Sequence, residues 1–292
     1  MIPEKFAYVA PTSLPDAIAQ LQAHPDEAKL LAGGQSLIPL MKLRLSNYAY
    51  LVDLRQVPGL AYIEERDGHL AIGAMTRESA LETTDVVRRR YPALYETSAV
   101  VADPLVRNFA TIGGNIAHAD PANDHPATML ALRARVVAEG PGGRRAFAID
   151  DFLVDTFETA LDHGEVLIEI QVPQPAPRSG SAYVKLERKV GDYAIVAVAA
   201  ALTLDGDVCS QAGIGLTNAG PKALRAADAE QFLVGKRVDD DTVREAARLA
   251  AAVADPVADL RGPAEYKRAM VRTLTARALR AAAWRATEGG AA

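Results

Sequence analysis

The hydrophobic positions of the first 57 residues fall into one helical repeat and several short apolar runs. Leu14, Ile18 and Leu21 recur at the spacing of a helix, and Ser13 stands where a helix cap is expected. Two short apolar runs, at residues 29–32 and 50–54, suit buried strands. Residues 38–45, which lie between them, suit a second helix. This succession of helices and strands predicts a small α/β unit, which we place at residues 1–57.

From residue 58 to residue 175 the pattern changes to hairpins and short helices. Apolar runs flank the turns Asp67-Gly68 and Gly140-Pro141-Gly142-Gly143, which predicts two β-hairpins. A further strand and helical segments are predicted at residues 165–170, 77–103 and 126–131. We therefore expect residues 58–175 to form an antiparallel sheet with helices, an α+β unit.

A proline-rich stretch at residues 173–180 predicts a linker to a third unit, residues 181–287. In that unit three apolar runs predict strands at residues 181–189, 195–204 and 208–217. Three alanine-rich periodic segments predict helices at residues 226–234, 241–252 and 264–285. The last helix carries a set of basic residues that we expect on its solvent-exposed face: Lys267, Arg268, Arg272, Arg277, Arg280 and Arg285.

Composition narrows the classes of protein that this chain can belong to. It has 292 residues and a net charge of −5, which argues against a surface for nucleic acid. Cys209 is the single cysteine, so the chain alone can build neither a disulfide framework nor a cysteine-ligated iron–sulfur cluster. The longest apolar run, residues 194–202, is far shorter than the ~20 residues of a membrane helix. With no apolar signal region at the N-terminus, we expect a cytoplasmic protein.

Candidate chemistry gathers in two glycine-rich segments. One is Ala32-Gly33-Gly34-Gln35-Ser36-Leu37, and the other is the stretch of residues 111–125 that begins Thr111-Ile112-Gly113-Gly114-Asn115. We interpret both as loops, because paired glycines let backbone N–H groups approach an anion such as a pyrophosphate. Neither segment matches the G-x-G-x-x-G or P-loop pattern, and Gly213-Ile214-Gly215 lies inside a predicted strand.

Other interpretations of these segments remain open from the residues alone. The first could be a plain strand-to-helix turn. The second could be a turn capped by its own carboxylates, or a mixed nitrogen and oxygen metal site built from His118, Asp120, Asp124 and His125.

Taken together, the motifs resemble a known family. The two glycine segments, with Asp120-Pro121 and Asp124, look like the two FAD-binding signatures of the flavin subunits of molybdenum hydroxylases, the xanthine dehydrogenase family. Within that family the chain is most similar to the medium subunits of aerobic carbon monoxide dehydrogenases. The segments 181–194 and 216–221 resemble further parts of the same subunits, so the resemblance covers essentially the whole chain.

The resemblance implies a fold and a role. The implied fold is α+β, an FAD-binding fold of the vanillyl-alcohol-oxidase/PCMH type with a small α/β and a larger α+β subdomain, followed by a C-terminal antiparallel sheet and helical bundle. The implied role is electron transfer: electrons from a substrate oxidised on a partner chain cross iron–sulfur clusters, reach FAD in this chain and leave to an external acceptor such as a quinone or NAD.

The same resemblance implies partners and a location. A large subunit would carry the molybdenum cofactor and a small subunit two [2Fe–2S] clusters, in a dimer of heterotrimers. The complex would be cytoplasmic, any association with the inner face of the membrane would be made through its partners, and no nucleic acid would be bound.

Site residues also follow from the resemblance. Residues 32–37 and 110–115 would wrap the pyrophosphate, Asp120 would shape the loop, Asp124 would bind ribityl or ribose hydroxyls, and Leu167 would give an apolar contact. Lys185 would lie near the flavin as a cation, and Tyr193 would lie against the isoalloxazine ring. The expected cofactor-binding residues are Ala32, Gly33, Gly34, Gln35, Ser36, Leu37, Ala110, Thr111, Gly113, Gly114, Asn115, Asp120, Asp124, Leu167, Lys185 and Tyr193. No residue is assigned as a catalytic acid or base or as a metal ligand.

Three further functions remain as alternatives. The chain could be the flavin subunit of a molybdenum hydroxylase for an N-heterocycle, a purine or an aldehyde. It could be a stand-alone FAD oxidoreductase with its own substrate, or a nucleotide-binding regulatory module without redox turnover.

Overall fold

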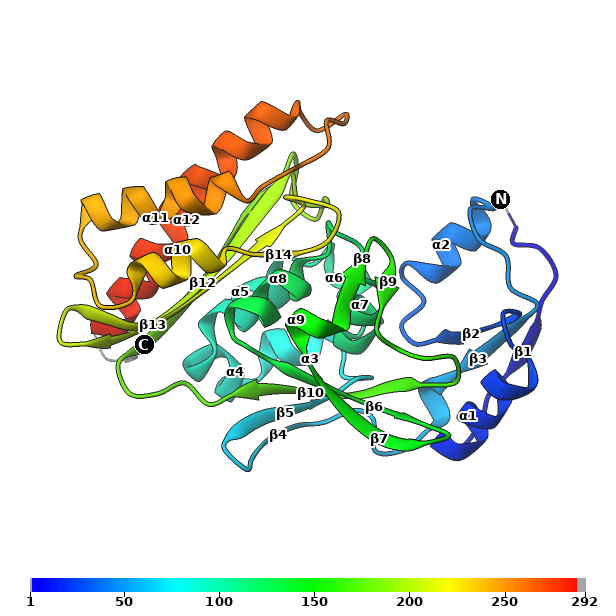
Figure 1. Ribbon diagram of the computed structural model, residues 1–292. Helices are drawn as coiled ribbons and strands as arrows, with labels where there is room; N and C mark the ends of the chain where they lie inside the picture. The colour runs from blue at the N-terminus through cyan, green and yellow to red at the C-terminus, as the bar shows by residue number, and fades with distance from the viewer. Residues whose placement is uncertain (1, 288–292) are drawn as a thin grey trace.

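The computed structural model describes residues 2–287. Its N-terminal part is a three-stranded parallel sheet of order β1-β3-β2 that lies at the right of Figure 1. The elements are β1 (Ala7–Val9), α1 (Leu14–Ala23), β2 (Ala28–Leu31), α2 (Leu37–Lys42), β3 (Tyr50–Asp53) and the 3-10 turn Leu54–Gln56. The predicted helices and strands are thus confirmed. Strand β1 was missed because it is only three residues long.

The middle part is a five-stranded antiparallel sheet of order β4-β5-β10-β6-β7, covered by short helices. Its strands are β4 (Ile63–Arg66), β5 (His69–Gly73), β6 (Arg135–Gly140), β7 (Gly143–Ala148) and β10 (Val166–Pro173), with a small hairpin of β8 (Leu153–Asp155) and β9 (Glu158–Thr159) beside them. Its helices are α3 (Glu78–Thr83), α4 (Asp85–Arg90), α5 (Pro92–Val100), α6 (Pro104–Arg107), α7 (Ile112–His118), α8 (Asp124–Ala131) and α9 (Ile149–Phe152). Both predicted hairpins are confirmed.

The interpretation of residues 111–125 as one extended loop was wrong. Residues 112–118 form helix α7, and Asp124 begins helix α8. The Thr111 side chain caps α7 by accepting a hydrogen bond from the Gly114 N–H. Gly113 is needed for packing: a Cβ there would come within 2.7 Å of the Ala74 Cα. Neither Gly113 nor Gly114 adopts a positive φ.

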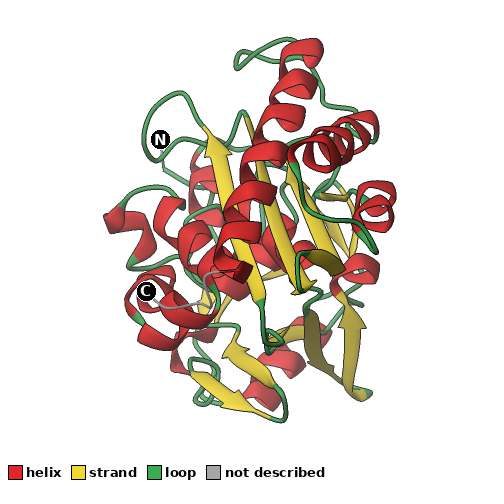
Figure 2. Ribbon diagram, turned by 90° about the vertical axis from the view of Figure 1, so that its left-hand side faces the viewer, coloured by secondary structure: helices red, strands yellow, loops and turns green. Residues whose placement is uncertain are grey.

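The C-terminal part is a four-stranded antiparallel sheet of order β11-β12-β13-β14 with three helices on one face. Its elements are β11 (Ser179–Leu186), β12 (Val196–Asp205), β13 (Val208–Thr217), β14 (Leu224–Arg225), α10 (Ala227–Leu233), α11 (Asp240–Ala252) and α12 (Ala264–Thr287). Figures 1 and 2 show long strands with helices on both sides: α10 and α12 pack on one face, and α5 and α8 of the middle part pack on the other.

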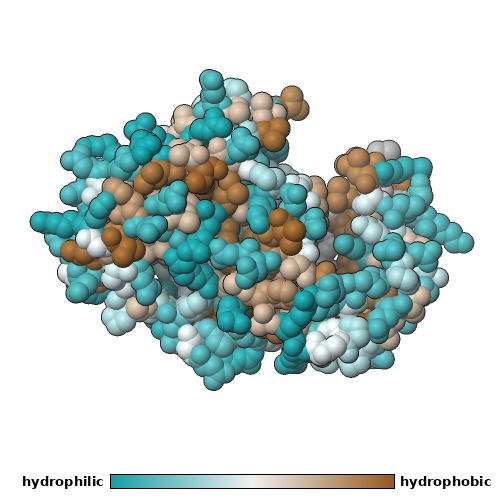
Figure 3. All heavy atoms as spheres, in the orientation of Figure 1, coloured by the Kyte–Doolittle hydropathy of each residue, from teal (hydrophilic) through white to brown (hydrophobic). Residues whose placement is uncertain are grey.

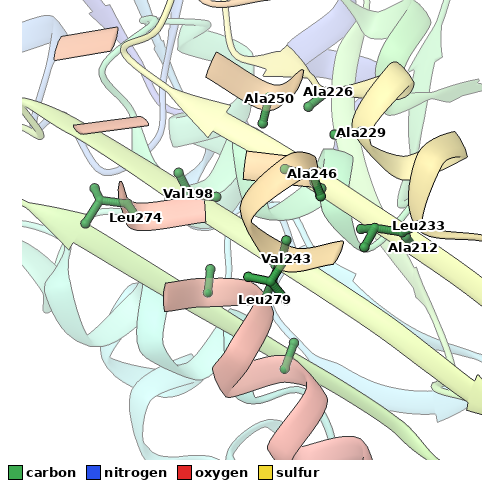
Figure 4. Close-up of a cluster of buried hydrophobic side chains, with 14 of the residues drawn as sticks. Val198, Ala212, Ala226, Ala229, Leu233, Val243, Ala246, Ala250, Leu274 and Leu279 are labelled. Carbon is green, nitrogen blue, oxygen red and sulfur yellow. The ribbon is translucent and has the colours of Figure 1, made fainter. Parts of the chain in front are cut away.

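The two faces of this sheet pack against helices in different ways. On the outer face, Val198 of β12 belongs to a buried cluster with Leu233 of α10, Val243 of α11, Leu279 of α12 and alanines of these helices (Figure 4). On the inner face the glycines of Gly213-Ile214-Gly215 let α8 approach, because a Cβ on either would overlap a backbone carbonyl of that helix. The motif is therefore a packing feature, in agreement with its rejection as a nucleotide loop.

One basic residue of α12 lies inside the protein and not on the expected solvent face. Lys267 is fully buried, and its ammonium group donates to the Val257 carbonyl at 2.9 Å and to the Asp259 carboxylate at 2.8 Å. These acceptors lie on the segment between α11 and α12 and satisfy the buried charge. Helical spacing alone did not indicate that Lys267, unlike the basic residues around it in α12, is fully buried.

Within residues 2–287, every helix is too short or too polar to cross a membrane.

Candidate functional site

The two glycine segments, some 75 residues apart in sequence, meet in the structure. A Cβ on Gly33 would come within 2.8 Å of the Ala110 Cα, and a Cβ on Gly114 would lie 3.6 Å from the Ala32 Cβ. The first segment comes from the N-terminal part and the second from the middle part. Figure 3 shows the molecular surface hollowed between these two parts.

The first segment joins β2 to α2. Gly34 has a φ of 72°, a left-handed conformation that favours glycine. The Gln35 side chain folds back, and its Nε2 donates to the Gly33 carbonyl at 3.2 Å. The Ser36 hydroxyl makes no cap hydrogen bond to α2 in the described part of the chain. It lies beside Tyr193 and acts to lower the pKa of that tyrosine.

The second segment presents short polar groups at the start of α7 and just after it. The Asn115 carbonyl accepts from the Asn123 side chain at 2.8 Å, and the Asp120 carboxylate accepts from the Ala122 N–H at 2.9 Å. Asp120 thus shapes its own turn, as expected. The Asn115 Oδ1 atom is buried and finds no hydrogen-bond partner among residues 2–287. Such an orphaned acceptor points to a missing donor, such as a hydroxyl of a bound ligand.

Asp124 and Lys185 form a buried ion pair beside this segment. The Lys185 ammonium lies 3.0 Å from one carboxylate oxygen of Asp124 and also donates to the Val100 carbonyl at 3.0 Å. The other oxygen of Asp124 accepts from the Tyr183 hydroxyl at 2.5 Å. Burial raises the pKa of the Asp124 carboxyl, and the Lys185 charge and the Tyr183 hydrogen bond oppose that rise.

Tyr193 lies at the open side of the site. Its ring is 45% exposed, and the Arg261 guanidinium lies 5.8 Å from the ring centroid. Partial burial raises the pKa of Tyr193, and the nearby Asp120 carboxylate acts in the same direction, whereas Arg261 opposes it. An exposed aromatic face held by a neighbouring cation suits the stacking of a planar ring.

Leu167 is a buried residue of the middle part. It lies on β10, next to an irregularity in the pairing with β6, and packs in the core of the middle part together with Ile116 and Ile170. Little of its side chain is exposed. Its contact with a ligand stays a prediction.

The four side chains of the metal interpretation face different partners. The His118 ring lies 5.0 Å from the Phe157 ring, whereas the fully buried His125 pairs with Glu78 at 2.6 Å. Asp120 bonds its own turn and Asp124 bonds Lys185. Within residues 2–287, His, Cys, Asp and Glu side chains form no group of three or more that could hold a metal ion.

Sequence reasoning missed two residues beside the site, Tyr183 and Glu187. Both lie on or directly after β11 at alternate positions with Lys185, and alternate residues of a strand share one face. The pattern Tyr183-x-Lys185-x-Glu187 was therefore the signal that could have found them.

The residues present fit an FAD molecule. Close-set backbone and a left-handed glycine suit a pyrophosphate, the Ser36 hydroxyl and the orphaned Asn115 oxygen suit the polar groups of FAD, and Tyr193 suits its ring. An acid or base catalyst, which the sequence did not indicate, is not required for redox chemistry carried by a flavin.

Two family models match this chain. Residues 4–175 match the FAD binding domain in molybdopterin dehydrogenase. Residues 181–282 match the CO dehydrogenase flavoprotein C-terminal domain.

Known proteins resemble the chain over nearly its whole length. It is 45% identical to the carbon monoxide dehydrogenase medium chain of Hydrogenophaga pseudoflava over 97% of this chain and 98% of that protein. It is 39% identical to the 6-hydroxypseudooxynicotine dehydrogenase complex subunit alpha of Paenarthrobacter nicotinovorans, over 98% and 97% of the two chains.

Solved structures agree. The carbon monoxide dehydrogenase of H. pseudoflava superposes with a TM-score of 0.95 at 46% identity, covering 98% of this chain and 99% of the other. Quinoline 2-oxidoreductase from Pseudomonas putida 86 superposes with a TM-score of 0.92 at 36% identity, covering 98% and 99%. These findings confirm the FAD-binding fold and FAD as the cofactor. The chain belongs to the family of FAD-binding subunits of molybdopterin dehydrogenases that carry a CO dehydrogenase flavoprotein C-terminal domain.

Proposed function

We propose that this chain is the medium, FAD-carrying subunit of a molybdenum hydroxylase that oxidises carbon monoxide. The observation that carries the proposal is the full-length similarity to carbon monoxide dehydrogenase medium chains, at 45% and 44% identity, in a chain whose two glycine segments meet at one site. Bound FAD would accept electrons from the partner chains and pass them to an external acceptor.

The chain itself supplies binding, orientation and electrostatics. We assign residues 32–37 and 110–115 to the pyrophosphate, and Asp120 and Asp124 to the shape and polarity of the wall beside it. Lys185 would contribute positive charge near the flavin, which favours the negative charge of the reduced ring. Tyr193 would cover one face of the ring.

The proposed partners rest on the similarity to medium chains of molybdenum hydroxylases. By that similarity we assign two [2Fe–2S] clusters to a small subunit and the molybdenum cofactor to a large subunit, in a dimer of heterotrimers. The single, buried Cys209 fits this assignment, because an iron–sulfur cluster requires several thiolates. A quinone or NAD is the proposed acceptor, and the complex is proposed to be cytoplasmic, with any membrane association made through its partners.

A second candidate function is favoured by the range of relatives. Proteins named for the oxidation of 6-hydroxypseudooxynicotine and quinoline are 39% and 36% identical to this chain, not far below the carbon monoxide dehydrogenases. A complex that oxidises an N-heterocycle would use the same flavin site, because the substrate is oxidised on a partner chain.

Affinity purification of this chain from its native cells tests the proposal. We expect two further subunits, molybdenum, iron and a flavin spectrum that bleaches when carbon monoxide is added. Bleaching by quinoline-type heterocycles and not by carbon monoxide would establish the second candidate. Turnover of an organic substrate by the isolated chain would contradict both and indicate a stand-alone oxidoreductase.

A further inference from the structure

Strand β11 carries a row of polar residues into the protein interior. Tyr183, Lys185 and Glu187 alternate along the chain, so their side chains share the face that meets α5 and α8. The surroundings of Tyr183 are otherwise small and apolar, with Ala131 and Ala197 among its neighbours. Polar groups in such an interior must satisfy one another.

Two side chains of this row contact Asp124, in the first turn of α8. The Tyr183 hydroxyl donates to Asp124 Oδ1 at 2.5 Å, and the Lys185 ammonium donates to Asp124 Oδ2 at 3.0 Å. The side chains of Asp124 and Lys185 are 8% and 4% exposed. Tyr183 has a second, longer contact with the Thr217 hydroxyl at 3.4 Å, so the carboxylate is its main partner.

This cluster borders the flavin site. The Asp124 carboxylate is close enough to Tyr193 to raise the pKa of that tyrosine, and the Ser36 hydroxyl of the first glycine segment acts on the same ring in the opposite direction. The titratable and charged groups that face the Asp124–Lys185 pair are Tyr183, Glu187, His125 and Tyr193, and Asp120 acts in turn on Tyr193. Of these, Tyr183 alone donates a hydrogen bond to the carboxylate.

We propose that Tyr183 is a positioning residue of the flavin site: its hydroxyl keeps Asp124 ionised and paired with Lys185. It thereby fixes the charge of the side of the site, here called the wall, that these residues form. The proposal rests on the proposed function, since it concerns the site assigned to FAD. The Tyr183 hydroxyl compensates one carboxylate oxygen that burial would otherwise leave unsatisfied. Asp124 then stays ionised, and the wall keeps the same charge across the neutral pH range.

Loss of the hydroxyl changes that charge at the acidic end of the range. Without its donor, the buried Asp124 carboxylate takes up a proton at a higher pH. Protonation makes the cluster one unit more positive, because Lys185 is no longer balanced by Asp124. A more positive wall stabilises the reduced, more negative flavin and raises its midpoint potential.

The test compares the pH dependence of the flavin midpoint potential in the purified complex for wild type, Tyr183→Phe, Asp124→Asn and Tyr91→Phe. Tyr91 is the matched control, because it is also a buried tyrosine, but its hydroxyl has no hydrogen-bond partner in the described chain. Protonation of Asp124 should appear as a break, a change of slope, in the plot of midpoint potential against pH. We expect Tyr183→Phe to raise the pH of this break by about one unit, which corresponds to a tenfold change in the ionisation constant of Asp124. Asp124→Asn should lack the break, and Tyr91→Phe should follow wild type.

A second measurement does not depend on the folding of Tyr183→Phe. The infrared difference spectrum between wild type and Asp124→Asn at neutral pH should show the loss of an ionised carboxylate and not of a protonated carboxyl. A protonated carboxyl there would overturn the proposal. So would a Tyr183→Phe complex that binds FAD with a potential curve superimposable on that of wild type. Wild-type complex without FAD would instead contradict the proposed function.

Discussion

At the scale of single residues, three glycines of the flavin site are required for three different reasons. Gly34 adopts a left-handed backbone conformation, and Gly33 lies against the backbone of the second glycine segment. Gly114 faces the cap of its own helix, because a Cβ there would lie 2.8 Å from the Thr111 hydroxyl. The structure therefore gives the substitution of each glycine a distinct expected effect.

We predict that Gly114→Val abolishes stable FAD binding. The added side chain must displace the Thr111 hydroxyl, which loosens the start of α7, and it adds bulk toward Ala32 of the first segment. Overpacking of this kind costs about 1–3 kcal/mol, which corresponds to a loss of affinity of roughly fivefold to 150-fold. The measurement is the flavin content of the purified variant and its dissociation constant for FAD.

Gly142→Ala is the control for Gly114→Val. A Cβ on Gly142 would meet no atom within 4 Å, so this variant should keep the wild-type flavin content. A Gly114→Val variant with one FAD per chain would show that the second segment does not hold the cofactor as proposed.

At the scale of elements, helix α8 is packed between the site and the C-terminal sheet. Its first turn carries Asp124, and its last residue, Ala131, lies against Gly213 of β13. The distance from the strand to the helix is set by the absence of a side chain on Gly213.

We predict that Gly213→Ala destabilises the fold by about 1–3 kcal/mol. An added Cβ would lie 2.9 Å from the Ala131 carbonyl carbon and closer still to its oxygen, and backbone cannot move aside as a flexible side chain can. Urea denaturation should show a lower midpoint for this variant. Gln211→Ala, an exposed position on the same strand, should match wild type, and equal midpoints for all three proteins would contradict the packing argument.

The small N-terminal sheet provides a prediction about pH. The buried Asp53 carboxylate at the end of β3 accepts from the Tyr8 hydroxyl of β1 at 2.6 Å and from the Arg55 side chain at 2.7 Å. Burial acts to raise the pKa of Asp53, but the hydrogen bonds from Arg55 and Tyr8 outweigh it and leave the pKa below the ordinary value of 3.8. A carboxyl with a lowered pKa stabilises the fold above its ordinary pKa and loses that contribution as the pH falls through the folded value.

Asp53→Asn should therefore lower the free energy of unfolding at neutral pH by about 1.5–3 kcal/mol, the value of a hydrogen bond to a charged group. It should also reduce the loss of stability between about pH 5 and about pH 2, because the variant has no charge to lose at this position. Thermal unfolding as a function of pH measures both effects. A variant as acid-sensitive as wild type would show that other carboxylates dominate.

At the scale of the whole molecule, the C-terminal part forms one wall of the proposed flavin site. Tyr183 and Lys185 of β11 bond Asp124 of α8. The side chain of Arg285 near the end of α12 also bonds Glu96 of α5 and the Ser181 carbonyl. The proposed boundary at residues 173–180 therefore separates two segments of chain that share an interior.

We predict that a fragment of residues 1–177 neither stays monomeric nor retains FAD. Without the C-terminal sheet, the apolar faces of α5 and α8 are exposed and Asp124 loses both of its partners. Size-exclusion chromatography, binding of a hydrophobic dye and flavin content measure the outcome. Co-expression with residues 178–292 is the control and should restore all three properties. A monomeric, FAD-loaded fragment 1–177 would show that the FAD-binding part is complete by itself.

The sequence by itself determined most of the secondary structure and the family. Periodicity, helix caps and glycine turns are local properties. They therefore identified helix α1, the hairpin of β4 and β5, strands β12 and β13, and helices α11 and α12 closely. The glycine signatures identified an FAD-binding subunit because a backbone that must approach a pyrophosphate constrains residue identity locally.

The tertiary structure decided what each side chain meets. It turned residues 112–118 into a helix, buried Lys267, and paired Asp124 with Lys185 and Tyr183. The contacts of Asp124 join residues about 60 positions apart, and helical or strand spacing records only which face a residue lies on. The partner that is brought to that face, and with it the charge of the proposed flavin site, follows from the packing of the C-terminal sheet against α8.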